Sequence, residues 1–144
     1  MAKWDPAGLL FSFKHPYDTL IHQLRLRGGK LIPEDINEHQ LYLLFLVNRE
    51  FGSHQKELAD QLFITKQSVG VIIEFLISKK YLTKTKDPVD ARANLIRLSD
   101  KGWNLVEQSR TIIKQIVEEW VKDIGEKNMK KLLNLLFRLS QEPK

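Results

Sequence analysis

The feature that most constrains the fold is a change of apolar period between residues 66 and 98. In residues 66–79, KQSVGVIIEFLISK, apolar side chains recur at helical spacing and form a wide stripe made of Val69, Ile72, Ile73, Leu76 and Ile77. Residues 81–85, YLTKT, and 94–98, NLIRL, are short and rich in β-branched or aromatic side chains, which favours strands. A charged turn separates them. The pattern therefore predicts a helix followed directly by an antiparallel β-hairpin.

A shorter helix precedes this one. Residues 54–62, HQKELADQL, carry one apolar face, and Ser53 is the expected N-cap. A connection of three residues leads into the longer helix, for which Thr65 is the expected N-cap because its hydroxyl can accept a free backbone N–H. Two helices joined by so tight a turn, followed by a basic hairpin, predict a winged helix-turn-helix.

Further apolar-periodic segments flank this region. We expect a helix over roughly 12–27 that stops at Gly28-Gly29, and another after Pro33 that runs out near Phe51-Gly52. Residues 100–124 are expected to form a helix of about 37 Å, which is longer than so small a domain covers alone and has a wide apolar face. A last amphipathic helix is expected over residues 126–140.

The expected fold class is therefore mainly α with a small β-hairpin wing (α+β). The 144 residues suit one domain, with no repeat or linker that marks an internal boundary. Within it we expect a winged helix-turn-helix lobe over residues 30–99. Residues 9–29 and 100–144 are expected to form a helical dimerisation region.

The positive charge of the chain is concentrated around the hairpin. Residues 79–101 hold seven basic side chains against three acidic ones, so this window carries +4 of the net +5 and the other 121 residues carry +1. Such a patch is either a solvated loop or a surface that meets a polyanion, and charge alone leaves both interpretations open.

The sequence lacks the residues that several classes of chemistry require. There is no cysteine, which excludes disulfides, thiolate metal sites and thiol catalysis. The four histidines lack metal-ligand spacing, and no phosphate loop or catalytic triad pattern occurs, so we expect no metal, no cofactor and no enzymatic activity. The longest apolar run, residues 41–47, is far shorter than the ~18 residues of a membrane span. We expect a cytoplasmic protein with no membrane association.

Four short motifs carry a family resemblance. They are Lys-Glu-Leu-Ala at the start of the first helix of the motif, Ile-Thr-Lys-Gln-Ser-Val at the entry to the second, Asp-Pro-x-Asp-x-Arg in the turn, and Leu-Ser-Asp-Lys-Gly at the start of the long helix. Together, residues 56–102 resemble the DNA-binding region of the MarR family of bacterial transcriptional regulators. The resemblance implies a homodimeric regulator, most often a repressor, that binds a pseudo-palindromic operator in double-stranded DNA.

The resemblance also implies roles for the wing residues. Arg92 would enter the DNA minor groove, and Asp90 would position it through an ion pair. A narrow A·T-rich minor groove attracts arginine by its negative potential, which supports this role independently. The alternative is a local ion pair with a structural role only. Lys84, Lys86 and Arg97 would contact phosphates.

On the second helix of the motif, the expected DNA contacts come from Thr65, Lys66, Gln67, Ser68 and Val71. Gln67 can bridge adenine N6 and N7, and Val71 can touch a thymine methyl group. Ser68 suits either a base or a phosphate. Lys66, in the first turn, is expected to contact a phosphate.

This helix also departs from the family pattern. The basic side chains that many members carry at the positions of Val71 and Phe75 are absent, and Glu74 would repel phosphate. Gly70 costs about 1 kcal/mol of helix stability relative to alanine, unless the backbone comes close to something there. We therefore expect more of the specificity to come from DNA shape, and complete loss of DNA binding is the alternative.

Family members are often released from DNA by a small aromatic or anionic ligand that binds between the dimerisation helices and the winged lobe. Tyr17, His22 and Phe45 lie on the helices expected to line that junction, and a plain packing role is the alternative for each. Two rival functions remain open. One is a winged-helix protein-interaction or architectural module without sequence-specific DNA binding, and the other is a small enzyme, for which we find no residue set.

Overall fold

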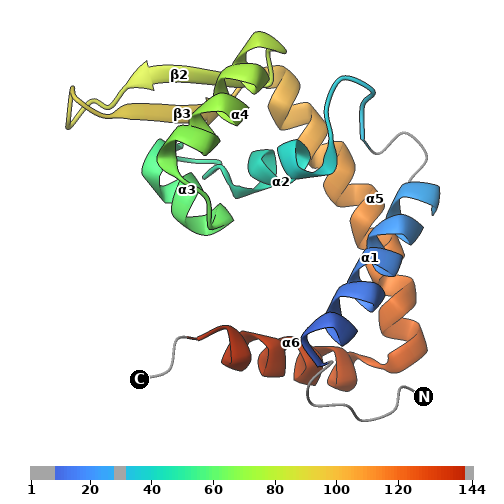
Figure 1. Cartoon of the computed structure of the whole chain (residues 1–144). Helices are drawn as coiled ribbons and strands as arrows, with labels where there is room; N and C mark the ends of the chain where they lie inside the picture. Colours follow the sequence, from blue (N-terminus) through green and yellow to red (C-terminus); the bar gives the residue numbers. More distant parts are fainter. Residues whose placement is uncertain (1–8, 28–31, 142–144) are drawn as a thin grey trace. The chain divides into compact units, whose positions relative to one another are not determined.

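The computed structural model describes residues 9–27 and 32–141, with side chains from Lys14 onward. The chain divides into two compact units, which we call the winged lobe (residues 30–110) and the helical unit (residues 1–29 and 111–144). The elements, labelled in Figure 1, are α1 (Leu9–Arg27), α2 (Glu38–Leu46), β1 (Ser53–His54), α3 (Gln55–Leu62), α4 (Lys66–Ser78), β2 (Leu82–Lys86), β3 (Asn94–Leu98), α5 (Asp100–Ile124) and α6 (Glu126–Ser140).

The expected fold class is confirmed, with one strand more than the sequence predicts. The sheet has the order β1-β3-β2, and all its pairs are antiparallel. The additional strand, β1, is Ser53–His54, which pairs with Ile96 and Leu95 of β3. Two residues are too few to show a period, so the sequence pattern carries no signal for this strand.

The expected N-cap at Ser53 is wrong, because Ser53 belongs to strand β1 and not to the start of α3. Ser53 is buried, and its hydroxyl accepts the backbone N–H of Asn48 at 2.9 Å. His54 takes the N-cap position of α3 in extended conformation. The carboxylate of Glu57, three residues on, lies 3.4 Å from the His54 backbone N–H, as in a capping box.

Helix α2 is shorter than expected at its C-terminal end. The Asn48 side chain accepts the backbone N–H groups of Glu50 and Phe51, at 3.0 and 2.8 Å, which folds the chain into a turn. Gly52 follows with φ +77°, a left-handed conformation that suits glycine. The helix therefore ends at Leu46 rather than near Phe51. The predicted stop of α1 at Gly28-Gly29 lies outside the described residues.

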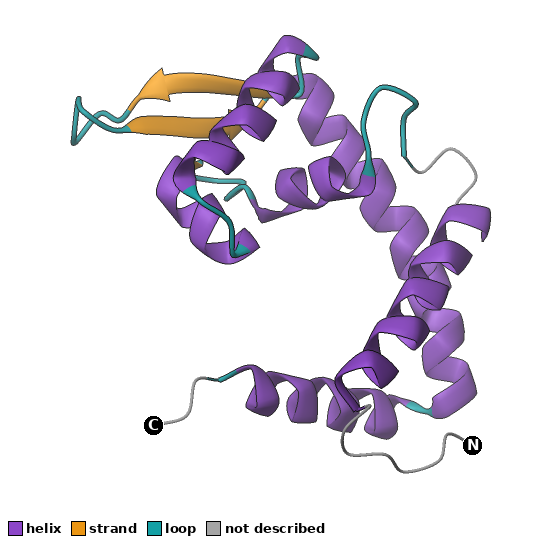
Figure 2. Cartoon of the chain, viewed as in Figure 1, coloured by secondary structure: helices purple, strands orange, loops and turns teal. Residues whose placement is uncertain are grey.

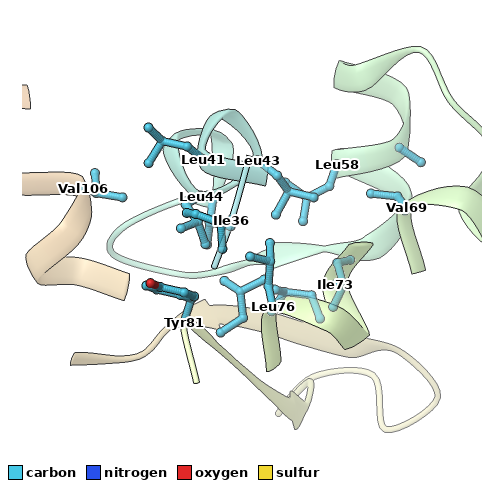
Figure 3. Close-up of a cluster of buried hydrophobic side chains, with 14 residues drawn as sticks. Ile36, Leu41, Leu43, Leu44, Leu58, Val69, Ile73, Leu76, Tyr81 and Val106 are labelled. Atoms are coloured by element: carbon cyan, nitrogen blue, oxygen red, sulfur yellow. The ribbon is translucent and has the colours of Figure 1, made fainter. Parts of the chain in front are cut away.

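The core of the winged lobe is built where four helices and the hairpin converge. Figure 3 shows side chains from α2, α3, α4 and α5 pointing into one cluster with Tyr81. From α4, Val69, Ile73 and Leu76 are at most 1% exposed, which confirms the predicted stripe. Burying one such aliphatic side chain contributes about 1.5–3 kcal/mol, so this face fixes which side of α4 remains outside.

The hairpin is anchored at its base and free at its tip. Leu82 pairs with Leu98 next to the core, and Lys86 pairs with Asn94 at the far end. Leu82 is buried, whereas the remaining residues of β2 toward the turn are exposed. Figure 2 shows the connecting loop extending beyond the helices of the lobe. The hairpin therefore has the form of a wing.

A second set of contacts fixes the first part of α5 to the lobe. The guanidinium of Arg49, in the turn after α2, lies 4.3 Å from the centre of the Trp103 ring and pairs with the Glu107 carboxylate. Trp103 is 40% exposed, so it serves as a cation–π partner rather than as a core residue. Gly102 lies so close to the Tyr81 carbonyl that a Cβ atom there would stand 2.1 Å from the oxygen.

The helical unit leaves much apolar surface open. The ion pair between Arg27 and Glu119 joins α1 to the second half of α5. No residue of α6 is buried, and its exposed apolar side chains are Leu132, Leu133, Leu135, Leu136, Phe137 and Leu139. On α1, Tyr17 and Leu26 are also exposed.

Among the described residues, no single helix is long and apolar enough to cross a membrane. The pair of α3 and α4, bent by 110° at its short break, meets such a test only by length and composition.

Candidate nucleic-acid interface

The N-terminus of α4 is shaped by Thr65, as predicted. Its hydroxyl oxygen accepts the Ser68 backbone N–H at 3.0 Å and its hydroxyl group donates to the Ser68 side chain at 2.8 Å. Both hydroxyls therefore serve the cap, which weakens the case for base contacts from them. Gln67 and Val71 are exposed, with Val71 at 69%, and so is Lys66 in the first turn. These three side chains form the free outer face of the helix start.

The turn between α3 and α4 has an unusual residue. Phe63 ends α3 in left-handed conformation, with φ 54°, and its side chain is 95% exposed. Such a conformation costs a non-glycine residue roughly 1–2 kcal/mol. The only trace of this conformation in the sequence is a three-residue connection between the two helices, Phe63-Ile64-Thr65, that contains no glycine.

The backbone at Gly70 comes close to another side chain, as a glycine in the middle of a helix suggested. The Gln55 side chain of α3 donates to the Lys66 carbonyl of α4 at 2.9 Å. A Cβ atom at Gly70 would lie 2.7 Å from that same amide nitrogen. The missing side chain therefore makes room for the hydrogen bond that fixes the crossing of α3 and α4.

Two aspartates build the wing turn. The Asp87 carboxylate accepts the backbone N–H of Val89 at 2.7 Å and of Asp90 at 3.4 Å. The Asp90 carboxylate accepts the backbone N–H of Arg92 at 3.0 Å. Between the Asp90 and Arg92 side chains, both of which the structure describes, there is no ion pair. The predicted ion pair is therefore replaced by a carboxylate that holds the backbone of Arg92 and leaves its side chain exposed.

The three side chains predicted to contact phosphates differ in their exposure and in their contacts within the chain. Lys84 forms an ion pair with Glu74 of α4, which offsets the negative charge that the sequence places on this helix. Arg97 donates to the Glu50 carbonyl at 3.2 Å and is half-buried. Lys86 is exposed at the end of β2, beside the wing turn. Of the three, Lys86 is placed best to meet a phosphate.

His54 connects the helix-turn-helix with the wing, a link that the sequence did not suggest. Its Nδ1 lies 2.9 Å from a Glu57 oxygen, and its Nε2 lies 2.5 Å from an Asp87 oxygen. The hydrogen bonds to Glu57 and Asp87 raise the pKa of His54 above its ordinary value. Hydrogen bonds from the Val89 backbone and from His54 lower the pKa of Asp87. Because 33 residues separate His54 from Asp87, no local pattern indicates their contact.

The three candidate ligand residues differ in their surroundings. Tyr17, at 63% exposure, and His22 are exposed on α1 of the helical unit. Phe45, on α2 of the winged lobe, packs against the core, and the Arg110 guanidinium lies 5.4 Å from its ring centre. Phe45 therefore has the packing role that was the alternative to ligand binding. For the described part of the chain, no cluster of histidine and acidic residues has an arrangement that could hold a metal ion.

Residues 34–93 match the model of the MarR family. The matched span includes both helices of the helix-turn-helix and the wing turn as far as Arg92. Over this span, which is 60 of the 144 residues, the chain is similar to the MarR family. This family consists of non-enzymatic, DNA-binding transcription regulators.

One curated relative and two solved structures are also similar to this chain. The chain is 25% identical over 104 residues to the uncharacterized HTH-type transcriptional regulator YdgJ of Bacillus subtilis (strain 168), a match that covers 72% of this chain and 63% of that protein. FabT of Streptococcus pneumoniae, solved in complex with DNA, superposes with a TM-score of 0.76 at 18% identity and 94% coverage of both chains. The PcaV transcriptional regulator of Streptomyces coelicolor, solved with its natural ligand, superposes with a TM-score of 0.69 at 19% identity and 97% coverage of both chains. At these identities, the two structures establish the fold.

Proposed function

We propose that this protein is a regulator of the MarR family, namely a dimeric, sequence-specific DNA-binding repressor of transcription. The observation that carries the proposal is the wing turn. Two aspartates hold backbone N–H groups there and leave the Arg92 guanidinium exposed at the tip of a basic hairpin. An arginine presented in this way suits a narrow minor groove, whose negative potential attracts it.

The second part of the proposal concerns α4, whose free outer face would lie in the major groove. Gln67 can form a bidentate contact with adenine, and Val71 can pack against a thymine methyl group. Lys66 and the capped N-terminus of the helix suit a phosphate. Because so few side chains on this face are able to read bases, DNA shape at the wing carries a large share of the specificity.

The exposed apolar face of α6 supports a dimer. Its six exposed apolar side chains remain open to solvent in the single chain, and a second copy can cover them around a two-fold axis. A two-fold dimer presents two copies of α4, so the operator would be a pseudo-palindrome with half-sites about one helical turn apart. A dimer bound over a promoter represses by excluding the polymerase.

We also propose control by a small aromatic or anionic ligand. The PcaV regulator, of the same fold, was solved with its natural ligand. On α1 of the helical unit, the exposed Tyr17 and His22 are the residues we propose for such contacts in this chain. The ligand releases DNA only if it binds the DNA-free state more tightly than the bound state. Thermal shifts that stay flat across a panel of aromatic acids would count against this part.

Selection of duplexes from a random pool tests the proposal. We expect the wild-type protein to enrich a pseudo-palindrome and the Arg92→Ala variant to lose preference at flanking A·T positions. The matched control is Lys86→Ala, which removes a neighbouring exposed wing cation. It should weaken binding evenly across sequences and lower the salt slope by about 0.9. Enrichment of no sequence by the wild type would support an architectural or protein-interaction role instead.

A further inference from the structure

His54 stands at the junction of the helix-turn-helix and the wing. It pairs with Leu95 of β3 through its backbone and occupies the N-cap position of α3. Its ring lies between Glu57 of α3 and Asp87 of the wing turn, with one ring nitrogen directed at each carboxylate. A single side chain therefore connects the start of the helix-turn-helix to the loop that presents Arg92.

The chemistry of this arrangement requires a charged ring. An ionised carboxylate only accepts hydrogen bonds, and a neutral imidazole has only one N–H to donate. Both contacts, 2.9 Å to Glu57 and 2.5 Å to Asp87, are therefore hydrogen bonds only when His54 is an imidazolium. Loss of the proton removes one donor and leaves a lone pair facing a carboxylate.

The contact with Asp87 continues into the wing. One Asp87 oxygen accepts from His54, and the other accepts the backbone N–H groups of Val89 and Asp90. Asp90 in turn holds the backbone N–H of Arg92. An unbroken series of hydrogen bonds thus runs from the start of α3 to the residue that we propose for the minor groove.

We propose that His54, in its protonated form, is a positioning residue that holds the wing turn through Asp87 and so fixes where Arg92 meets DNA. The inference rests on the proposed DNA-binding function. Its consequence is that operator affinity depends on pH through a residue that need not contact DNA.

The direction of the pH dependence follows from the groups around the ring. Glu57 from α3 and Asp87 from the wing are the charged groups that face it, and the β3 partner, Leu95, is apolar. The pKa of His54 is raised, so the contact is present below that pKa and is lost as the pH rises through it. The pKa of Asp87 is lowered, so the contact is lost at acid pH only below that value. The wing is therefore held best between the two values.

The test compares operator affinity from about pH 6 to about pH 8.5 at constant salt. The wild type should bind roughly three- to tenfold more weakly at the alkaline end, as expected for the loss of one hydrogen bond. His54→Gln should bind at the weaker level throughout and show no step. His39→Gln, which alters an exposed histidine on α2, is the matched control and should keep the step. Arg92→Ala should lose the step, because the wing then has no minor-groove arginine to position.

A measurement on the free wild-type protein separates this inference from the proposed function. In NMR titrations, the backbone amides of Val89 and Arg92 should shift with the same midpoint as the His54 ring. If they do so while the protein binds no duplex at any pH, the positioning contact stands and the DNA-binding proposal fails. The inference is overturned if the protein binds its operator but the chemical shifts of these amides do not follow the titration of His54. It is also overturned if the affinity of His54→Gln keeps the pH step.

Discussion

Asp90 shows how one residue can serve a site without touching its ligand. Aspartate side chains often accept backbone N–H groups one or two residues further along a turn, and Asp90 does this for Arg92 at 3.0 Å. The Arg92 guanidinium is then free of the partner that an ion pair would give it. At the scale of the residue, the wing motif builds a turn that exposes an arginine.

Substitutions at Asp90 distinguish this arrangement from an ion pair. An asparagine side chain keeps the oxygen that accepts the Arg92 N–H, so Asp90→Asn should leave operator affinity close to that of the wild type. Asp90→Ala removes the acceptor and should weaken binding roughly three- to tenfold. Fluorescence anisotropy with a labelled operator measures both. Equal losses in the two variants would favour the ion pair instead.

The two helical glycines of the lobe should respond differently to alanine. At Gly102 the new Cβ would lie 2.1 Å from the Tyr81 carbonyl oxygen, which belongs to the backbone and cannot move aside cheaply. We expect Gly102→Ala to lower the free energy of unfolding by about 1–3 kcal/mol. Gly70→Ala meets only the mobile end of Gln55, and a gain of about 1 kcal/mol in helix propensity offsets the lost hydrogen bond. Urea unfolding curves with equal midpoints for both variants would contradict this account.

At the scale of elements, the period of the apolar side chains explains what the sequence predicted and what it missed. The stripe on α4 and the two strands of the hairpin lie in segments long enough to show a pattern in the sequence, and each lies within one residue of its predicted position. Strand β1 has two residues, and the end of α2 is set by an asparagine side chain, so neither leaves a periodic trace. The contact between His54 and Asp87 joins residues 33 positions apart that only the folded chain brings together, so no local pattern predicts it.

The ion pair between Glu74 of α4 and Lys84 of β2 is an element-level feature with a measurable consequence. In Glu74→Gln, Lys84 is released toward the DNA and the negative charge on α4 is gone. Operator affinity should rise, and the slope of log affinity against log salt should steepen by up to about 0.9, the value for one further phosphate contact. The control is Asp60→Asn on α3, which removes one exposed acidic charge from the lobe without releasing Lys84. An unchanged slope in Glu74→Gln would show that Lys84 stays away from DNA.

At the scale of the whole molecule, charge and apolar surface lie in different parts of the sequence. The basic window of residues 79–101 includes the wing, whereas exposed leucines gather on α6 of the helical unit. This division suits a protein that uses one region to meet a polyanion and the other to meet a second copy of itself.

A charged residue in the apolar face of α6 tests whether this face meets a second copy of the chain. Leu133 is 59% exposed in the single chain, so Leu133→Glu should change the stability of the folded chain by no more than about 0.5 kcal/mol. In a dimer interface the buried charge should weaken association by at least about tenfold. Lys131→Glu, on the same helix, is the matched control. Sedimentation that shows the same mass for both variants and the wild type would argue against α6 as the interface.

The ratio of two affinities tests whether the winged helix of this protein reads DNA sequence. Wild-type protein would be titrated at physiological salt against the selected operator and against a scrambled duplex of the same length and base composition. Sequence-specific recognition by α4 and the wing predicts a ratio of at least about 10³. A ratio near one would mean that the protein binds the backbone only, and that its winged helix does not read sequence.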